Sequence, residues 1–165
     1  MPAKQANGLD AIDIKILSAL QRDGRMTIQK LASYAGLSPR PCLERVRRLR
    51  ASGIIAGFQA VIDIERLSKP VTIFTEVSLT RQARLDRIEA RLKVIEEAVE
   101  CWEISGPSDY LVRFVCEDLE RYEALTAELL GDRRLGIARL QSHIALRPVS
   151  RFSGYPAALF NPRGR

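Results

Sequence analysis

The 165-residue sequence lacks the features that mark membrane-spanning or secreted proteins. It has no run of about 18 consecutive apolar residues, so we expect no membrane-spanning helix. Residues 1–9 are polar and contain no apolar segment of the kind found in a secretory signal. The three cysteines, Cys42, Cys101 and Cys116, lie far apart and form no CxxC pair, which argues against a disulfide framework or a zinc site. We therefore expect a cytoplasmic protein without a bound metal.

Catalytic signatures are also missing. The one histidine, His143, falls within an alternating segment, and a lone histidine is more often structural than catalytic. The patterns HExxH, GxSxG, GxGxxG and GxxxxGK do not occur, so the sequence gives no support for a metalloprotease, an α/β-hydrolase or a nucleotide-binding protein. Cys42 is expected on an apolar helix face, where burial is more common than reactivity. The sequence predicts a protein that is not an enzyme and uses no cofactor.

Positive charge is concentrated toward the N-terminus. The net charge is +6 and the isoelectric point is about 9.6. Residues 1–66 contain 11 Lys and Arg against 6 Asp and Glu, whereas residues 67–147 contain 12 against 14. Residues 148–165 add three Arg and no acid. This distribution is typical of a nucleic-acid-binding protein, although a mildly basic surface without a partner would give the same totals.

Two helices are predicted before residue 37. The first, over residues 9–22, has apolar residues at helical spacing, with Asp10 as its N-cap and Asp13 in its first turn. The second follows Thr27, which is a suitable N-cap, and ends at Gly36, where glycine can adopt the left-handed conformation.

A third helix is predicted over residues 39–52, directly after a tight turn, and the pair forms a helix-turn-helix. Ser38 is the expected N-cap, and Pro39 occupies the first helical position. At 100° per residue the apolar side chains fall on one side and most of the charges on the other. Five Arg against a single Glu between residues 40 and 50 favour contact with DNA over an ordinary solvated face, which usually mixes both signs. The predicted DNA-contacting residues are Ser38, Arg40, Glu44, Arg45, Arg47 and Arg48. This hypothesis requires guanidinium groups that point outward and are not held in ion pairs within the chain.

Residues 54–64 alternate and are predicted as a further strand, followed by a linker over residues 65–69. From residue 70 the pattern predicts the order βαββαβ, which is typical of a ferredoxin-like fold with two helices on one face of a four-stranded antiparallel sheet. The expected fold class is α+β. The expected divisions are a helix-turn-helix domain at 1–64, a linker at 65–69, a ferredoxin-like effector and oligomerisation domain at 70–147, and a tail at 148–165 without an assigned role.

The second face of such a sheet carries no helices. Alternate strand positions would place apolar side chains such as Phe74, Trp102 or Phe114 on it. Because monomers rarely expose a contiguous apolar patch, we expect the chain to self-associate through this face.

The motifs together resemble those of the leucine-responsive regulator/AsnC (Lrp/AsnC) family. The N-terminal match includes Leu9-Asp10, Gly36-Leu37-Ser38-Pro39 and Gly53-Ile54-Ile55, and the later one is the Gly-x-x-Asp-Tyr turn at Gly106, Asp109 and Tyr110. The resemblance covers roughly residues 9–147. It implies a winged helix-turn-helix joined to a ferredoxin-like (RAM-type) domain, double-stranded DNA as partner, homodimers that assemble to octamers, and an amino-acid effector held between subunits. By position it implies an effector site containing Gly106, Asp109, Tyr110, Ser142 and His143.

Two alternatives remain beside this resemblance. The stretch from Gly106 to Asp109 would form a plain β-turn whether or not it binds an effector. A standalone amino-acid-binding module would account for the C-terminal fold but would leave the Arg-rich helix unexplained. The chain also has Arg40 where family members often have Thr and Glu44 where they often have a basic residue, so operator preference does not transfer from relatives.

Overall fold

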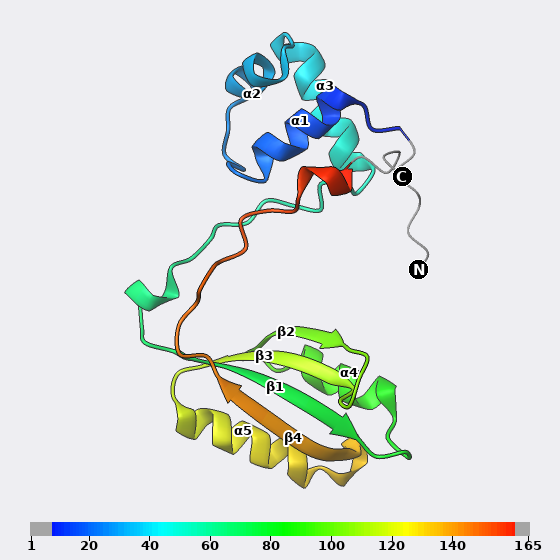
Figure 1. The fold of residues 1–165 in the computed structure, drawn as a ribbon, viewed down its shortest axis with the longest axis vertical. Coiled ribbons are helices and arrows are strands. Elements are labelled where there is room, and N and C mark those ends of the chain that lie inside the picture. The colour runs from blue at the N-terminus through cyan, green and yellow to red at the C-terminus, as the bar shows by residue number, and fades with distance from the viewer. Residues whose placement is uncertain (1–7, 161–165) are drawn as a thin grey trace. The chain divides into compact units, whose positions relative to one another are not determined.

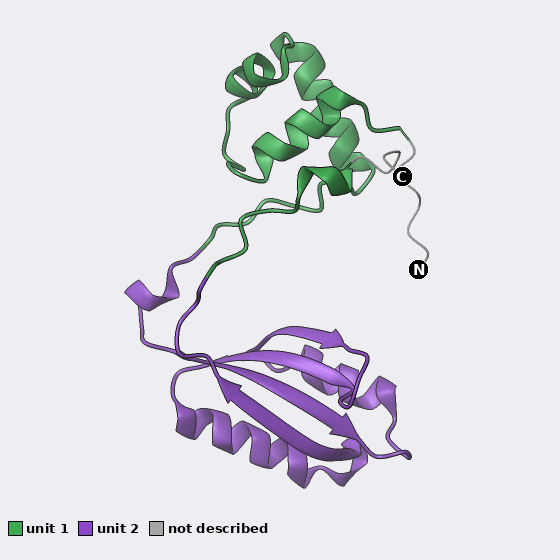
Figure 2. Cartoon of the chain, in the orientation of Figure 1, with its two compact units in different colours: residues 1–61, 150–165 green, residues 62–149 purple. Residues whose placement is uncertain are grey.

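The computed structural model describes residues 8–160 and divides the chain into two compact units (Figures 1 and 2). The first unit combines residues 1–61 with residues 150–165, and the second contains residues 62–149. Each unit has a separate hydrophobic core. The C-terminal tail expected at 148–165 extends beyond the described residues after Phe160. Within the described chain, no helix has both the length and the apolar character needed to cross a membrane.

Three helices form the first unit: α1 (Ala11–Leu20), α2 (Ile28–Ala35) and α3 (Pro39–Ala51). Asp10 caps α1 as predicted, since its carboxylate accepts hydrogen bonds from the backbone N–H groups of Ile12 and Asp13. The side chain of Thr27 caps α2, and Gly36 ends it at φ +72°. The helices surround a core centred on three fully or almost fully buried side chains, Ile16, Leu31 and Leu49.

Helix α3 begins at the predicted residue. Pro39 takes the first position, but the Ser38 side chain forms no capping hydrogen bond. Cys42, Val46 and Leu49 are buried against the other helices, which confirms the predicted apolar face.

The strand predicted over residues 54–64 does not form. Residues 54–63 run without regular secondary structure, and a short 3-10 helix covers Ile64–Arg66. The backbone N–H of Ile55 donates to the carbonyl of Leu49, and the side chain of Val61 is 93% exposed. Alternation indicates an extended backbone, but a strand also needs a neighbouring strand to accept its hydrogen bonds, and none lies beside this segment in the described chain.

The segment from Ser150 to Phe160 packs with the first unit. The side-chain amide of Gln21 donates a hydrogen bond to the backbone carbonyl of Tyr155 at 3.0 Å. It also accepts a hydrogen bond from the backbone N–H of Tyr155 at 2.9 Å. A short helix, Ala157–Phe160, lies against α1, and Phe160 packs on the core of this unit. Between this segment, α1 and residues 54–58 lies an apolar cavity of about 860 Å³.

The second unit has the predicted βαββαβ order. Its elements are β1 (Val71–Leu79), α4 (Leu85–Lys93), β2 (Ala98–Glu103), β3 (Tyr110–Cys116), α5 (Leu119–Gly131) and β4 (Ile137–Ile144), with a 3-10 turn at Arg133–Leu135. The strands lie in the order β2-β3-β1-β4 and each neighbouring pair is antiparallel. The predicted α+β fold class is therefore confirmed.

The register of the strands decides which side chains face the helices. Ile73 of β1 lies opposite Phe114 of β3, and both are buried beneath α4 and α5. The prediction that Phe114 lies on the helix-free face is therefore wrong, because directly paired residues share one face of the sheet. Phe74 pairs with Arg113 and His143 and lies on the opposite, helix-free face. Trp102 follows Cys101 on β2, pairs with Leu111, and is 47% exposed.

Candidate functional site

Helix α3 presents part of the predicted DNA-contacting face to solvent. The side chain of Arg40 is 91% exposed, and its Nε lies 3.5 Å from the carboxylate of Glu44. Arg47 and Arg50 are also exposed, and among the described residues neither has a carboxylate within ion-pairing distance. These side chains are therefore available to bind phosphate groups, for which the planar guanidinium supplies paired donors.

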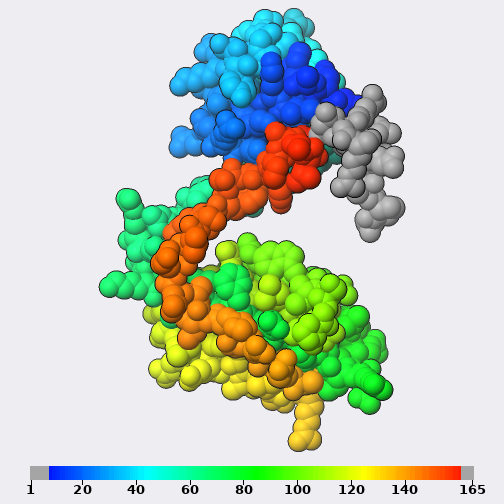
Figure 3. All heavy atoms as spheres, viewed as in Figure 1, coloured from blue at the N-terminus to red at the C-terminus, as the bar shows by residue number. Residues whose placement is uncertain are grey.

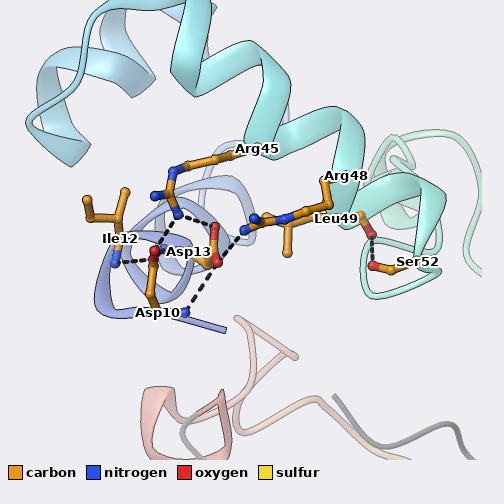
Figure 4. Close-up of polar contacts among 7 residues, drawn as sticks. All are labelled: Asp10, Ile12, Asp13, Arg45, Arg48, Leu49 and Ser52. Carbon is orange, nitrogen blue, oxygen red and sulfur yellow. Dashed lines mark hydrogen bonds and ion pairs between the residues drawn. The ribbon is translucent and has the colours of Figure 1, made fainter. Parts of the chain in front are cut away.

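Arg45 and Arg48 differ from these three arginines, because both are held by carboxylates of the first helix (Figure 4). Nη1 of Arg45 lies 2.6 Å from Oδ2 of Asp10 and 2.9 Å from Oδ1 of Asp13. Nη2 of Arg48 lies 2.6 Å from Oδ2 of Asp13. The prediction that both guanidinium groups are free of ion pairs within the chain is therefore wrong, because they form ion pairs that join α3 to α1. The side chain of Arg48 is nevertheless 58% exposed, whereas that of Arg45 is 24% exposed.

The cause is the buried carboxylate of Asp13, whose side chain is 0% exposed. A carboxylate removed from water is costly unless opposite charges and hydrogen-bond donors surround it. Arg45, Arg48 and the backbone N–H of Asp10 provide those donors. The backbone N–H of Asp13 and the guanidinium of Arg45 lower the pKa of Asp10, and the pKa of Arg45 is raised in return.

A sequence signal for these pairs exists but is easily missed. Asp10 and Asp13 are three residues apart on one helix, and Arg45 and Arg48 have the same spacing on another. Residues at this spacing lie in one row, so two oppositely charged rows can align across a helix–helix contact. Arg50, which the sequence placed near the border of the face, is exposed, and like Arg47 it has no carboxylate within ion-pairing distance among the described residues.

The candidate effector residues do not converge on one site within a single chain. Oδ2 of Asp109 accepts the backbone N–H of Leu79 at 2.7 Å, so this carboxylate holds the end of β1. Gly106 adopts a φ of +132°, a conformation that favours glycine, in the turn between β2 and β3. The residues therefore form an ordered turn at the edge of the sheet.

The other candidates lie on two different faces of the sheet. Tyr110 is buried on the helix side, and its hydroxyl donates a hydrogen bond to Glu89 at 3.3 Å. Its pKa is raised to about 12, mainly by burial and to a smaller extent by the negative charge of Glu89. The hydroxyl of Ser142 also lies on the helix side, where it bonds to the hydroxyl of Tyr122. His143 lies on the helix-free face, 3.6 Å from Glu76. The sequence did not identify Glu76 or Tyr122 as partners.

The helix-free face of the second unit combines apolar and charged groups. Nη2 of Arg113 lies 3.3 Å from Glu100, and Ser108 donates to Glu76 at 2.8 Å. The Nε of Arg113 is buried and has no hydrogen-bond partner.

Within residues 8–160, no cluster of three or more acidic, histidine or cysteine side chains is arranged to bind a metal ion.

Comparison with known proteins identifies both units. Residues 9–50 match the model of the AsnC-type helix-turn-helix domain, and residues 72–154 match that of the Lrp/AsnC ligand-binding domain. The chain is 36% identical over 151 residues to the leucine-responsive regulatory protein of Haemophilus influenzae, with 90% of each chain covered. It is 40% identical over 150 residues to the Bkd operon transcriptional regulator of Pseudomonas aeruginosa, covering 90% of this chain and 97% of that one.

Solved structures give the same result. A transcriptional regulator from Neisseria meningitidis, crystallised as an L-Met complex, has a TM-score of 0.84 and 29% identity, covering 93% of this chain and 99% of that chain. An AsnC family regulator from Agrobacterium tumefaciens has a TM-score of 0.85 and 27% identity, covering 93% and 100%. These relatives are regulators and not enzymes, which confirms the prediction that the chain is not an enzyme. The chain belongs to the Lrp/AsnC family of transcription regulators, which combine a DNA-binding helix-turn-helix with a ligand-binding domain.

Proposed function

We propose that this chain is an oligomeric, sequence-specific regulator whose affinity for an operator is modulated by an amino acid. The observation that carries the proposal is the exposed face of α3, where Arg40, Arg47 and Arg50 extend from a helix that is joined to α1 by ion pairs with the buried carboxylate of Asp13. A rigidly held helix with outward guanidinium groups has the chemistry needed to lie in a major groove. Ser38 and Glu44 lie on the same exposed side and contribute to base selection.

Self-association uses the helix-free sheet face. Phe74 and Trp102 lie there beside paired charges, and the sheet leaves this surface without a helical cover. A homodimer carries two copies of α3, which we propose contact successive turns of a duplex, about 34–36 Å apart. Dimers then assemble further, with octamers expected from the family resemblance. Since the partner is chromosomal DNA and all three cysteines are free thiols, we place the protein in the cytoplasm.

The amino-acid effector is supported by the ligand-binding domain and by the L-Met complex of the Neisseria meningitidis relative. Because Gly106, Asp109, Tyr110, Ser142 and His143 do not enclose a site within one chain, we propose that a second subunit completes it. Binding would shift how subunits assemble and change operator affinity by about 1–3 kcal/mol.

The DNA-binding part is tested with a pool of random-sequence duplexes, from which the full-length protein selects its operator. Wild-type protein should enrich a two-fold-symmetric sequence, and Arg47→Ala/Arg50→Ala should reduce affinity for it by at least tenfold. An exposed control, Lys15→Ala/Arg25→Ala, should have a much smaller effect. Unchanged binding by the α3 variant would reject the proposed interface.

The effector part is tested by a thermal-shift screen of the twenty amino acids, because a ligand that binds only the folded state raises the melting temperature. At least one amino acid should raise it and also change operator affinity. If none of the twenty does either, the proposed effector class is wrong.

A further inference from the structure

One end of the second unit carries a strongly basic surface that the helix-turn-helix does not explain. Two segments, residues 81–87 and 132–139, together contain six Arg and two Asp. We call these side chains the basic rim; its members are Arg81, Arg84, Arg87, Arg133, Arg134, Arg139, Asp86 and Asp132. All six arginines are exposed.

The two segments lie against each other although they are about fifty residues apart in the sequence. The backbone N–H of Thr80 donates to the carbonyl of Gly136 at 2.8 Å. A Cβ placed on Gly136 would lie 2.6 Å from the Cβ of Ala83, so the two turns are closely packed. Arg139 pairs with Ser78 in the β1–β4 register. Figure 3 shows both segments on the surface at the same end of this unit.

The acids of the rim do not neutralise it. Asp86 pairs with Arg84 at 3.1 Å, and Asp132 pairs with Arg134 at 2.8 Å, each within its own segment. Hydrogen bonds from Arg134 lower the pKa of Asp132 to about 2, with a smaller effect from Arg87. Among the described residues, Arg81, Arg133 and Arg139 have no carboxylate within ion-pairing distance. The rim therefore has a formal net charge of +4.

This charge is segregated within a unit that is not basic as a whole. Residues 67–147 carry a net charge of −2, so the excess acid lies elsewhere. Residues 96–123, for example, contain nine Asp and Glu against two Arg. Unneutralised like charges gathered on one surface repel each other and lower stability, so the binding of an anionic partner there would be favourable.

We propose that the basic rim is a second DNA-contacting surface, which binds the phosphate backbone of a duplex already held by α3. The inference rests on the proposed function. The rim is exposed, spread over two turns and a strand, and composed of Arg without Lys, so it fits an extended chain of phosphates better than a small carboxylate, which requires an enclosed site. Contacts of this kind add affinity without reading sequence.

The test compares two duplexes, one of about 20 bp containing a single selected operator and one of about 150 bp with the same operator at its centre. The rim variant is full-length Arg81→Ala/Arg133→Ala/Arg139→Ala. The control, Arg66→Ala/Lys69→Ala/Lys93→Ala, removes the same number of charges from other positions of this unit. Affinity is measured as a function of salt concentration for each pair.

On the long duplex, the rim variant should lower the slope of log affinity against log salt by about 0.9 for each phosphate that the protein no longer neutralises, and the control should not. On the short duplex, the rim variant and the control should bind equally well. Equal slopes for rim and control variants on the long duplex would overturn the inference. So would a rim variant whose only change is a smaller oligomer by light scattering, since that result would assign the rim to the interface between copies.

The two proposals fail in different ways. If Arg47→Ala/Arg50→Ala binds both duplexes as the wild type does, the proposed function is wrong. If that variant loses binding while the rim variant matches its control, only the second surface is rejected.

Discussion

The guanidinium of Arg45 lies 2.9 Å from the fully buried carboxylate of Asp13, and this pair joins the third helix of the DNA-binding unit to the first. An arginine at the edge of a recognition helix therefore acts in the stability of the unit. Its loss would reduce DNA binding indirectly, by loosening the helix that carries Arg47 and Arg50.

Arg45→Ala should lower the free energy of unfolding by about 1.5–3 kcal/mol, because Asp13 would keep only part of its compensation after losing one charged hydrogen bond. Urea denaturation followed by circular dichroism would measure the loss. Arg47→Ala is the matched control, since this exposed side chain has no ion pair in the described residues, and its effect should stay within about 0.5 kcal/mol. Equal stability of the two variants would contradict a structural role for Arg45.

The stability of the first unit should also depend on pH through Asp10. Because its pKa in the folded chain lies below the ordinary value of 3.8, the ionised form stabilises the fold, and this contribution is present above that value. It is lost as the pH falls through the lowered folded-state pKa. Asp10→Asn keeps a good capping residue but does not titrate. Denaturation at pH 7 and at about pH 3 should show a smaller pH-dependent loss for Asp10→Asn than for wild type, and an equal loss would rule out this role.

In the second unit, the hydroxyl of Tyr122 bonds to two partners, Thr75 at 2.7 Å and Ser142. Thr75 is fully buried, so removal of the phenolic hydroxyl leaves its polar group without a partner. Tyr122→Phe should therefore cost about 1–3 kcal/mol of unfolding free energy. Tyr34→Phe, at a residue that is 53% exposed, should cost almost nothing, and urea denaturation of both variants would compare them. Equal unfolding free energies would show that the buried hydroxyl contributes little.

Gly154 is a position in the C-terminal segment where an added side chain would meet Gln21. Its φ is +119°, and an added Cβ would lie 2.7 Å from Cδ of Gln21, which holds Tyr155 by two hydrogen bonds. Gly154→Ala should displace the segment and speed hydrogen exchange at the Tyr155 amide. The control is Gly131→Ala, at the end of α5, where nothing lies within 4 Å of the added carbon. Unchanged exchange in the Gly154 variant would show that the contact with Gln21 does not hold the segment.

The carboxylate of Asp109 accepts a hydrogen bond from the backbone N–H of Leu79, so a test of its expected effector role must separate binding from stability. Asp109→Ala removes the acceptor for the Leu79 N–H and should destabilise the turn, whereas Asp109→Asn keeps an oxygen there but no charge. If the carboxylate contacts the amino group of an effector, Asp109→Asn should retain stability and lose the thermal shift given by that effector. If Asp109→Asn keeps the full thermal shift, the charge of Asp109 does not contribute to effector binding.

Periodicity was sufficient to predict helices α1 to α5 and strands β1 to β4, because apolar spacing directly reflects burial, but it did not predict that residues 150–160 belong to the first unit. The stripe containing Ile16 predicted α1, and the alternation around Ile73 predicted β1. Register and partners were harder to predict. Phe114 was placed on the wrong face because alternation separates two faces without showing which one the helices cover. The strand expected over residues 54–64 failed because an extended pattern carries no information about a neighbouring strand.

The same limit applies to the candidate site. A helical wheel correctly set Arg40 and Arg47 apart from the buried Cys42, but it considers one helix at a time. The acids that engage Arg45 and Arg48 lie on α1, more than thirty residues away in the sequence. Their positions depend on how the helices pack, which the spacing within α3 does not specify.

The return of Ser150–Phe160 to the first unit means that the polypeptide crosses between the units twice, once near residue 61 and again near residue 149. A single proteolytic cut in the first crossing would therefore divide the first unit between two fragments, and only the packing of the returning segment against residues 1–61 would hold those fragments together. A fragment that stops at residue 61 would lose Phe160 from its core and expose the apolar groups that the returning segment covers. The DNA-binding unit is thus not a contiguous module, and truncation of the C-terminus removes part of it.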